Sequence, residues 1–262
     1  MTTGHGICYT GCKYTGQLAV LPRPACLIFG RKGTTMVSLS IFGTPVKVKG
    51  TVLVPIVALW GIVTWLGFYW HPERGFWQGV LIGFVTVLLL APADFGHALA
   101  HIFSARYAGA PIDEIRLSAG MPRTLYWNNE VSPDVHRMRA MGGPIFNVLG
   151  LLLSAVIYAV ARGNPIIREL AGWSTVGHGW LLLAALLPLP MVDGGTLVKW
   201  TLVARGRTEK EADEMVRRVD WVLGIVGGII GVGLTAMQMW IAGVIVAGIG
   251  AVAIAIAAGK LR

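Results

Sequence analysis

The stretch FWQGVLIGFVTVLLLAPADFGHALAHIF, residues 76–103, decides how this sequence is interpreted. It is longer than the roughly 20 apolar residues that an α-helix needs to cross the hydrocarbon core of a bilayer. Near its end it carries Asp94, His97 and His101. Ionisable side chains are costly inside a membrane and by default mark a functional site. The stretch therefore predicts a transmembrane helix with chemistry near one end.

The composition extends this prediction to the whole chain. Hydrophobic residues make up 55% of the 262 residues and charged residues only 13%, and the mean hydropathy is +0.65. A soluble domain carries about 25% charged residues. We therefore expect an all-α polytopic membrane protein with about six transmembrane helices. The six apolar segments are residues 51–70, 76–103, 142–161, 172–191, 222–240 and 241–259.

The last two apolar segments are nearly continuous. We expect a tight hairpin near Trp240, with a single long helix or a re-entrant pair as the alternatives. The first of the two segments carries the glycine pairs Gly224 and Gly228, and Gly227 and Gly231. This small-xxx-small spacing lets helices approach closely. It predicts either packing within the chain or a dimer face, and the oligomeric state stays open.

Positive charge falls mainly on one side of the predicted helices. If the N-terminus is cytoplasmic, nineteen of the 22 Lys and Arg residues lie in cytoplasmic segments, and only Arg74, Arg162 and Arg168 lie on the other side. Cytoplasmic loops are enriched in Lys and Arg, so we expect both termini to be cytoplasmic. Positively charged loops on the cytoplasmic side of the lipid bilayer thus explain the net charge of +9. No nucleic-acid partner is expected.

The chain divides into four parts by composition. Residues 1–35 lack periodicity and form either a disordered tail or a segment upstream of a true start at Met36. Its cysteines, Cys8, Cys12 and Cys26, are expected to be free thiols, because no second cysteine pair completes a zinc ribbon. The other parts are a membrane core (36–200), a cytoplasmic loop (201–221) and a C-terminal transmembrane hairpin (222–262).

The spacing of two histidines suggests a metal site. His97 and His101 lie on one face of the predicted helix, one turn apart. Both imidazoles can therefore reach one metal ion, as they do in the H-E-x-x-H motif. The alternative is a pair of packed histidines that bond to carbonyl groups inside the bundle.

Three sequence motifs resemble those of the site-2 protease family. HALAHIFSARYAG, residues 97–109, is similar to the family signature H-E-x-x-H-x-x-x-A-R-x-x-G at every fixed position except the glutamate, where this chain has Ala98. GPIFN, residues 143–147, is similar to the family's G-P-x-x-N helix start. LPLPMVDGG, residues 187–195, is similar to its L-P-x-P-P-L-D-G-G segment.

The resemblance has limits. It covers about residues 37–200 and leaves out the last two helices. Met191 and Val192 depart from the third motif, and Ala185 stands where the family usually has asparagine.

The resemblance implies an intramembrane zinc metalloprotease that hydrolyses peptide bonds in transmembrane protein substrates near the cytoplasmic side. It implies that His97, His101 and Asp193 bind zinc, and the predicted topology independently puts these three residues at a similar depth. It implies Asn147 as an oxyanion or substrate contact. It also implies a small β element between the second and third helices, where residues 112–117 and 124–127 have the pattern of short strands.

The position of the catalytic glutamate holds alanine. The methyl group of Ala98 can neither take a proton from water nor pass it to the leaving amine. General acid–base catalysis contributes about 10²- to 10⁴-fold, so we expect hydrolysis to be impaired or lost. A natural pseudoprotease, an engineered inactive variant and replacement of the base by another residue are three open explanations.

Two further ionisable residues bear on this question. Asp94 lies on the same helical stripe as both histidines, one turn deeper. It is the candidate substitute for the base or a partner that orients His97, and a carboxyl group that faces another helix is the alternative. His178, in the fourth apolar segment, either approaches the site or bonds to a neighbouring helix.

Two functions of different classes fit these residues. One is a site-2 protease-like hydrolase, and the other is a non-catalytic pseudoprotease that acts as a membrane scaffold for client helices. A metal transporter is disfavoured, because a path across the membrane needs ligands beyond a single site.

The charge asymmetry makes the topology testable. Thr208→Cys and Gly163→Cys, in a background without the native cysteines, should react with impermeant thiol reagents from opposite sides of the membrane. We expect the cysteine at position 208 to be labelled only from the cytoplasm and that at position 163 only from the other side. Labelling of position 208 from outside would contradict this topology.

Overall fold

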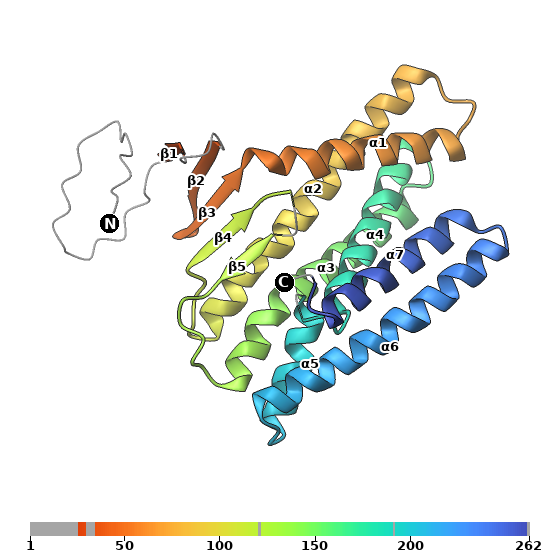
Figure 1. Cartoon of the computed structure of the whole chain (residues 1–262). Helices are drawn as coiled ribbons and strands as arrows, with labels where there is room; N and C mark the ends of the chain where they lie inside the picture. The colour runs from red at the N-terminus through yellow and green to blue at the C-terminus, as the bar shows by residue number, and fades with distance from the viewer. Residues whose placement is uncertain (1–25, 30–34, 120–121, 191, 261–262) are drawn as a thin grey trace.

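A computed structural model describes residues 26–29, 35–119, 122–190 and 192–260. It is mostly helical, which confirms the predicted fold class, and long helices run side by side with a small sheet at one end of the bundle (Figure 1). The helices are α1 (Leu53–Trp70, after a 3-10 turn at Gly50–Val52), α2 (Phe76–Tyr107), α3 (Pro133–Val160), α4 (Pro165–Leu186), α5 (Asp193–Ala204), α6 (Glu209–Ala236) and α7 (Trp240–Ala257).

Five helices of the described chain are long and apolar enough to cross a membrane, namely α1 with its 3-10 turn, α2, α3, α6 and α7. The fourth predicted span, residues 172–191, corresponds to α4, which has the length but not the apolarity. Its first turns carry Arg168 and Glu169, and its middle carries Ser174, Thr175 and His178. α4 is therefore a helix of mixed polarity that packs against α3 and α2 inside the bundle.

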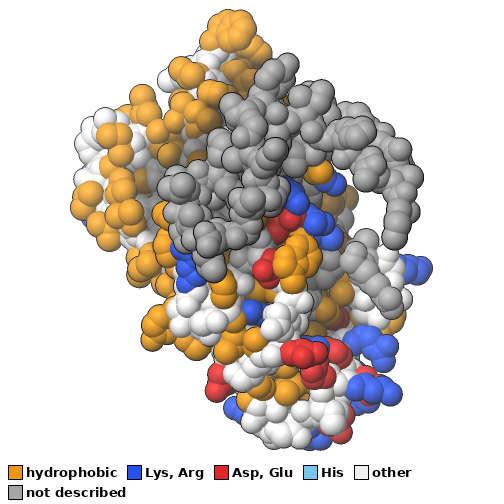
Figure 2. Space-filling view, turned by 90° about the vertical axis from the view of Figure 1, so that its left-hand side faces the viewer, with side chains coloured by type: hydrophobic (Ala, Val, Ile, Leu, Met, Phe, Trp, Pro, Cys, Tyr) orange, Lys and Arg blue, Asp and Glu red, His pale blue; other side chains and the backbone are white. Residues whose placement is uncertain are grey.

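The surface of the bundle is apolar, as lipid contact requires. Large side chains such as Trp77, Val160 and Val232 are 78%, 74% and 69% exposed. On the face drawn in Figure 2, hydrophobic side chains cover much of the upper part, and charged side chains gather in the lower part. Exposed apolar area of this extent is unfavourable in water. The structure thus indicates an integral membrane protein.

The sheet is larger than the sequence predicted. Its five strands follow the order β1 to β5 and are antiparallel except for the parallel pair β3 and β4. β4 and β5 lie between α2 and α3 and confirm the predicted β element, whereas the three preceding strands were not predicted. The strands are β1 (Cys26–Phe29), β2 (Thr35–Ile41), β3 (Thr44–Lys49), β4 (Glu114–Leu117) and β5 (Arg123–Leu125).

The predicted N-terminal tail, residues 1–35, falls largely outside the described residues. Its described part includes the edge strand β1, which pairs with β2. The sequence of β2 and β3 has the alternating pattern of strands, although these strands were not predicted. Residues 36–49 alternate apolar and polar side chains around Phe42 and Gly43, which turn the chain with positive φ values of 48° and 73°.

The sheet packs on the end of α2 that follows the histidines. Val46 of β3 and Ile115 of β4 are fully buried against Ile102 and Ala105 of α2. Glu114 lies beneath them, where Lys47 Nζ reaches its Oε2 at 2.6 Å and Arg116 also contacts it. Burial opposes ionisation of Glu114, but these two cations outweigh it and hold the pKa of its carboxyl group below the usual value. The sheet and the α2 end thus form one packed unit.

The predicted loop at residues 201–221 is mostly helical. It contains the end of α5, a short turn and the first turns of α6. Thr208 caps α6 through a capping box with Glu211, whose side chain accepts a bond from the Thr208 backbone N–H. Such a cap satisfies two backbone donors at the start of a helix, so α6 begins well before its apolar part.

α6 and α7 pack against each other, and three glycines of α6, Gly224, Gly227 and Gly231, lie against α7. A Cβ atom at Gly231 would lie 2.6 Å from the backbone nitrogen of Ala247 on α7, and a Cβ at Gly224 would lie 3.0 Å from the Gly250 carbonyl oxygen. Side chains at these positions would push the two helices apart. The pair Gly227 and Gly231, together with Gly224, therefore joins α6 to α7, as small residues do at membrane helix interfaces.

This contact predicts a difference between two neighbouring glycines of α6. Gly231→Leu should destabilise the hairpin by about 1–3 kcal/mol, the range for overpacking. Gly228→Leu is the matched control, because a Cβ at Gly228 meets nothing within 4 Å. Denaturant unfolding in detergent micelles measures both. Equal stability of the two variants would show that the contact between α6 and α7 is not as tight as described.

Candidate metal centre

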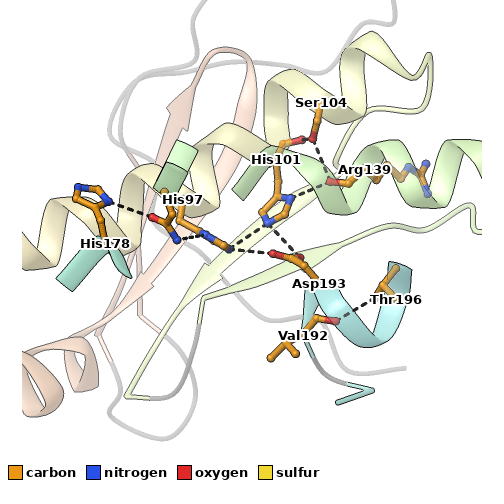
Figure 3. A network of polar contacts seen from close by, with 9 residues as sticks. His97, His101, Ser104, Arg139, His178, Val192, Asp193 and Thr196 are labelled. Atoms are coloured by element: carbon orange, nitrogen blue, oxygen red, sulfur yellow. Dashed lines mark hydrogen bonds and ion pairs between the residues drawn. The ribbon is translucent and has the colours of Figure 1, made fainter. Parts of the chain in front are cut away.

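Three side chains from two helices meet at one point. His97 and His101 come from α2 and Asp193 from the first residue of α5, and one donor atom of each lies within 4.8 Å of the others. His97 Nε2 lies 3.2 Å from Asp193 Oδ2, His101 Nε2 lies 3.4 Å from Asp193 Oδ1, and the two Nε2 atoms lie 3.3 Å apart (Figure 3). The three residues that the sequence suggested as metal ligands are thus brought together.

The local backbone explains this convergence. The four-residue spacing puts the two imidazoles on one face of α2, where they meet edge to face. Asp193 follows the Leu-Pro-Leu-Pro segment, where α4 has ended, and starts α5. On the third side, α3 places Gly143 against both rings, and a Cβ there would collide with the imidazoles of His97 and His101. Glycine at this position therefore leaves the space in which the rings and a metal ion fit.

A backbone carbonyl sets the protonation of His101. The Nδ1–H of His101 donates to the Arg139 carbonyl oxygen at 2.8 Å. A carbonyl oxygen can only accept, so this nitrogen carries the proton of the neutral imidazole. Its Nε2 then has a free lone pair directed at His97 and Asp193. This is the pattern of a metal-binding histidine, whose second nitrogen is held by a carbonyl or carboxylate group.

Asp193 lacks a partner for one of its oxygens. Its Oδ2 is buried and makes no hydrogen bond among the described residues, although His97 Nε2 lies 3.2 Å away. A buried carboxylate with one oxygen free of hydrogen bonds among the described residues, beside two imidazoles, fits a divalent cation. Two histidines and one aspartate form a donor set that suits zinc.

The other predicted site residues lie close to this centre. Ala98 is only 2% exposed, so its methyl group lies within the protein beside both ligands on α2. Asn147 is fully buried, and its side-chain amide lies 2.9 Å from His97 Nδ1. Asp94 is half-buried one turn away, and within the described chain it makes no hydrogen bond to His97. The catalytic roles suggested for Asp94 and Asn147 stay predictions.

Two residues join the centre to its surroundings in ways that motif matching did not reveal. Arg139 is 5% exposed, accepts from His101 through its carbonyl and packs its guanidinium 4.1 Å from the Tyr126 ring centre, just after β5. Burial raises the pKa of Tyr126. His178 of α4 bonds to Asn147, its Nδ1 lying 3.2 Å from Asn147 Oδ1. The sequence feature that points to His178 is an ionisable side chain within an apolar segment.

The comparison with solved structures bears on the fold. The site-2 protease from Methanocaldococcus jannaschii has a similar structure, with a TM-score of 0.52 over 87% of this chain and 95% of that protein, at 16% sequence identity. The fold is similar to that of a site-2 protease. No family model matches the chain, and no curated protein matches it. The likeness therefore concerns the arrangement of helices and strands.

The geometry predicts zinc binding that depends on three side chains. Purified protein should contain about one zinc ion per chain, and His97→Ala, His101→Ala and Asp193→Ala should each reduce the content strongly, because each removes one of three ligands. His71→Ala, which changes a histidine in the turn between α1 and α2, is the control and should keep its zinc. Metal analysis of carefully prepared samples decides the matter. Negligible zinc in the unmodified chain would contradict the prediction.

Proposed function

We propose that this protein is a site-2 protease-type intramembrane metalloprotein that holds zinc and is impaired in peptide-bond hydrolysis. The observation that carries the proposal is the convergence of His97, His101 and Asp193 inside a bundle with this fold. The buried Asp193 oxygen without a hydrogen-bond partner supports a cation at that point.

The residues of the proposed site have different roles. His97, His101 and Asp193 would hold the ion, and His101 is kept in the required tautomer by the Arg139 carbonyl. A zinc ion there would supply Lewis acidity and bring the pKa of a bound water to about 7. Gly143 lets α3 approach the two imidazole rings, because a Cβ atom there would collide with them. The apolar bundle limits access of bulk water and strengthens electrostatic interactions inside.

The step that this chain lacks is proton transfer. A hydrolase needs a side chain that takes the proton of the attacking water and returns it to the leaving amine. Ala98, in the position next to His97, has no group for either transfer. Asp94 lies one turn away. Among the described residues it makes no hydrogen bond to His97 or His101. We therefore infer a protein that retains ligand geometry and has lost most of its hydrolytic rate.

The second candidate function is a non-catalytic scaffold. It is favoured by one observation, namely that the ligand set is intact while the base is alanine and almost fully buried. In this version the protein binds client transmembrane helices within the bilayer and releases them uncut. We propose the cytoplasmic side for both termini and for the sheet, on the charge asymmetry of the sequence.

The two functions are separated by restoring the base. Ala98→Glu should create zinc-dependent cleavage of a model transmembrane peptide, about 10²- to 10⁴-fold above the unmodified chain. Ala98→Gln is the matched control, since it has nearly the same size and no basic carboxylate. The measurement is product formation in proteoliposomes with and without a chelator. Cleavage by the glutamine variant at the same rate would rule out a role for the carboxylate.

The same assay tests Asp94 and the scaffold function. If the unmodified chain cleaves slowly, Asp94→Asn should abolish the residual rate without loss of zinc only if Asp94 is the substitute base. If Ala98→Glu binds zinc and cuts none of a varied set of helical peptides, the scaffold is the better description. Zinc content measured on each variant separates a lost metal from a lost base.

A further inference from the structure

A row of three polar side chains crosses the bundle from α4 to the metal centre. His178 Nδ1 lies 3.2 Å from Asn147 Oδ1, and Asn147 Nδ2 lies 2.9 Å from His97 Nδ1. Asn147 is fully buried and His178 is 8% exposed. Figure 3 draws the row from His178 through to Asp193.

The face of α3 is shaped to receive this row. Gly143, Asn147 and Gly150 are spaced by four and three residues, so they lie on one face of the helix. A Cβ atom at Gly143 would collide with the rings of His97 and His101, and one at Gly150 would collide with the ring of His178. α3 thus seats imidazoles from α2 on one side of Asn147 and an imidazole from α4 on the other. The neighbouring Phe146 ring lies 5.9 Å from His178 and packs beside it.

The row links the proton on His97 to the orientation of Asn147. In the arrangement shown, the amide Nδ2 faces His97 Nδ1 and donates to it. The neutral His97 then carries its proton on Nε2, the nitrogen that faces Asp193. A metal ion needs the lone pair of that nitrogen. For metal binding the proton must therefore lie on Nδ1, which then requires an acceptor, namely the amide oxygen.

The two ends of a side-chain amide have the same shape, so the hydrogen-bond network decides which end faces which partner. When the Asn147 oxygen accepts from His97, the amide N–H points at His178 Nδ1. That nitrogen can accept when the proton of His178 is on Nε2. Both orientations of Asn147 are therefore fully bonded only because His178 can act as donor or acceptor.

We infer that His178 is a positioning residue for the metal centre, which acts through Asn147 to hold His97 in its metal-binding tautomer. The inference rests on the proposed zinc site. Without His178, the metal-ready orientation leaves an amide N–H unpaired in the bundle, whereas the opposite orientation leaves only a carbonyl oxygen unpaired. Orphaned buried N–H groups are rarer in proteins than under-satisfied carbonyls. Loss of His178 therefore favours the tautomer that cannot bind metal.

The test measures zinc affinity by chelator competition in detergent-solubilised full-length protein. His178→Phe keeps a ring and removes the polar atoms, and we expect about tenfold weaker binding, the lower end for partners of metal ligands. His178→Gln keeps a donor and an acceptor and should bind nearly as well as the unmodified chain. Ser154→Ala is the matched control, because Ser154 is equally buried and joins α3 to α4 through Thr175, away from the site. It should leave the affinity unchanged.

A double mutant separates positioning from general packing. Because His178 acts through Asn147, His178→Phe should have no further effect on zinc affinity in an Asn147→Leu background. An equal loss in both backgrounds, or a loss no greater than that of Ser154→Ala, would overturn the inference.

A second measurement does not need zinc. Nitrogen-15 chemical shifts of His97 report its tautomer in the metal-free protein, and His178→Phe should shift the tautomer ratio whereas Ser154→Ala should not. If the unmodified protein binds no zinc, the proposed function fails and these shifts still decide the role of His178. An unchanged ratio in His178→Phe would overturn it.

Discussion

Lipid offers no hydrogen-bond partner to polar groups inside this bundle, so those on α3 bond to a neighbouring helix or to a carbonyl group of α3 itself. This constraint accounts for the central position of α3. Asn147 pairs with α2 and α4, Ser154 accepts a bond from Thr175 of α4, and the Arg139 carbonyl accepts from His101 of α2. Since unpaired polar groups are costly in an apolar environment, these bonds fix how the helices are rotated about their axes. The metal centre is a product of that rotation.

At the opposite end of the bundle, buried charged groups are likewise paired with each other. Arg74, in the turn before α2, makes a two-pronged ion pair with Glu169 of α4, at 3.0 and 2.7 Å. Both side chains are largely buried, with 8% and 18% of their surface exposed. The pair explains how α4 carries charge in its first turns and still packs against the bundle. Its planar geometry suits arginine and would not be reproduced by lysine.

The sequence predicted those features that depend on local spacing. The four-residue interval of His97 and His101, the lengths of the apolar segments and the alternation in β4 and β5 all lie within a few turns of chain. It did not predict α5, because Asp193 is followed by two glycines and the helix is short. It also missed the pairing of β3 with β4, whose strands are separated by two helices. The partner of Asn147 depends on helix rotation, which no local pattern encodes.

The likeness in fold concerns the architecture of the protein, whereas the residue at position 98 concerns the chemistry of its site. A fold supports many chemistries, and function belongs to the side chains in its sites. Ala98 is almost fully buried, but the hydrophobic cluster between the sheet and α2 does not include it. In the proposed function the side chain at position 98 governs hydrolysis, whereas the architecture depends on many residues.

The separation of the ligands along the chain has a consequence for assembly. His97 and His101 lie one turn apart within one helix, but Asp193 follows about ninety residues later, after two more helices have been made. During synthesis His97 and His101 enter the membrane before Asp193 has been made. The site is complete only when α5 folds against α2 and α3. An ion bound there links the early and late parts of the chain and stabilises only the fully assembled state. With zinc at the proposed site, metal supply would therefore act on the maturation and lifetime of this protein as well as on its chemistry, and the same would hold for a version that never cleaves a bond.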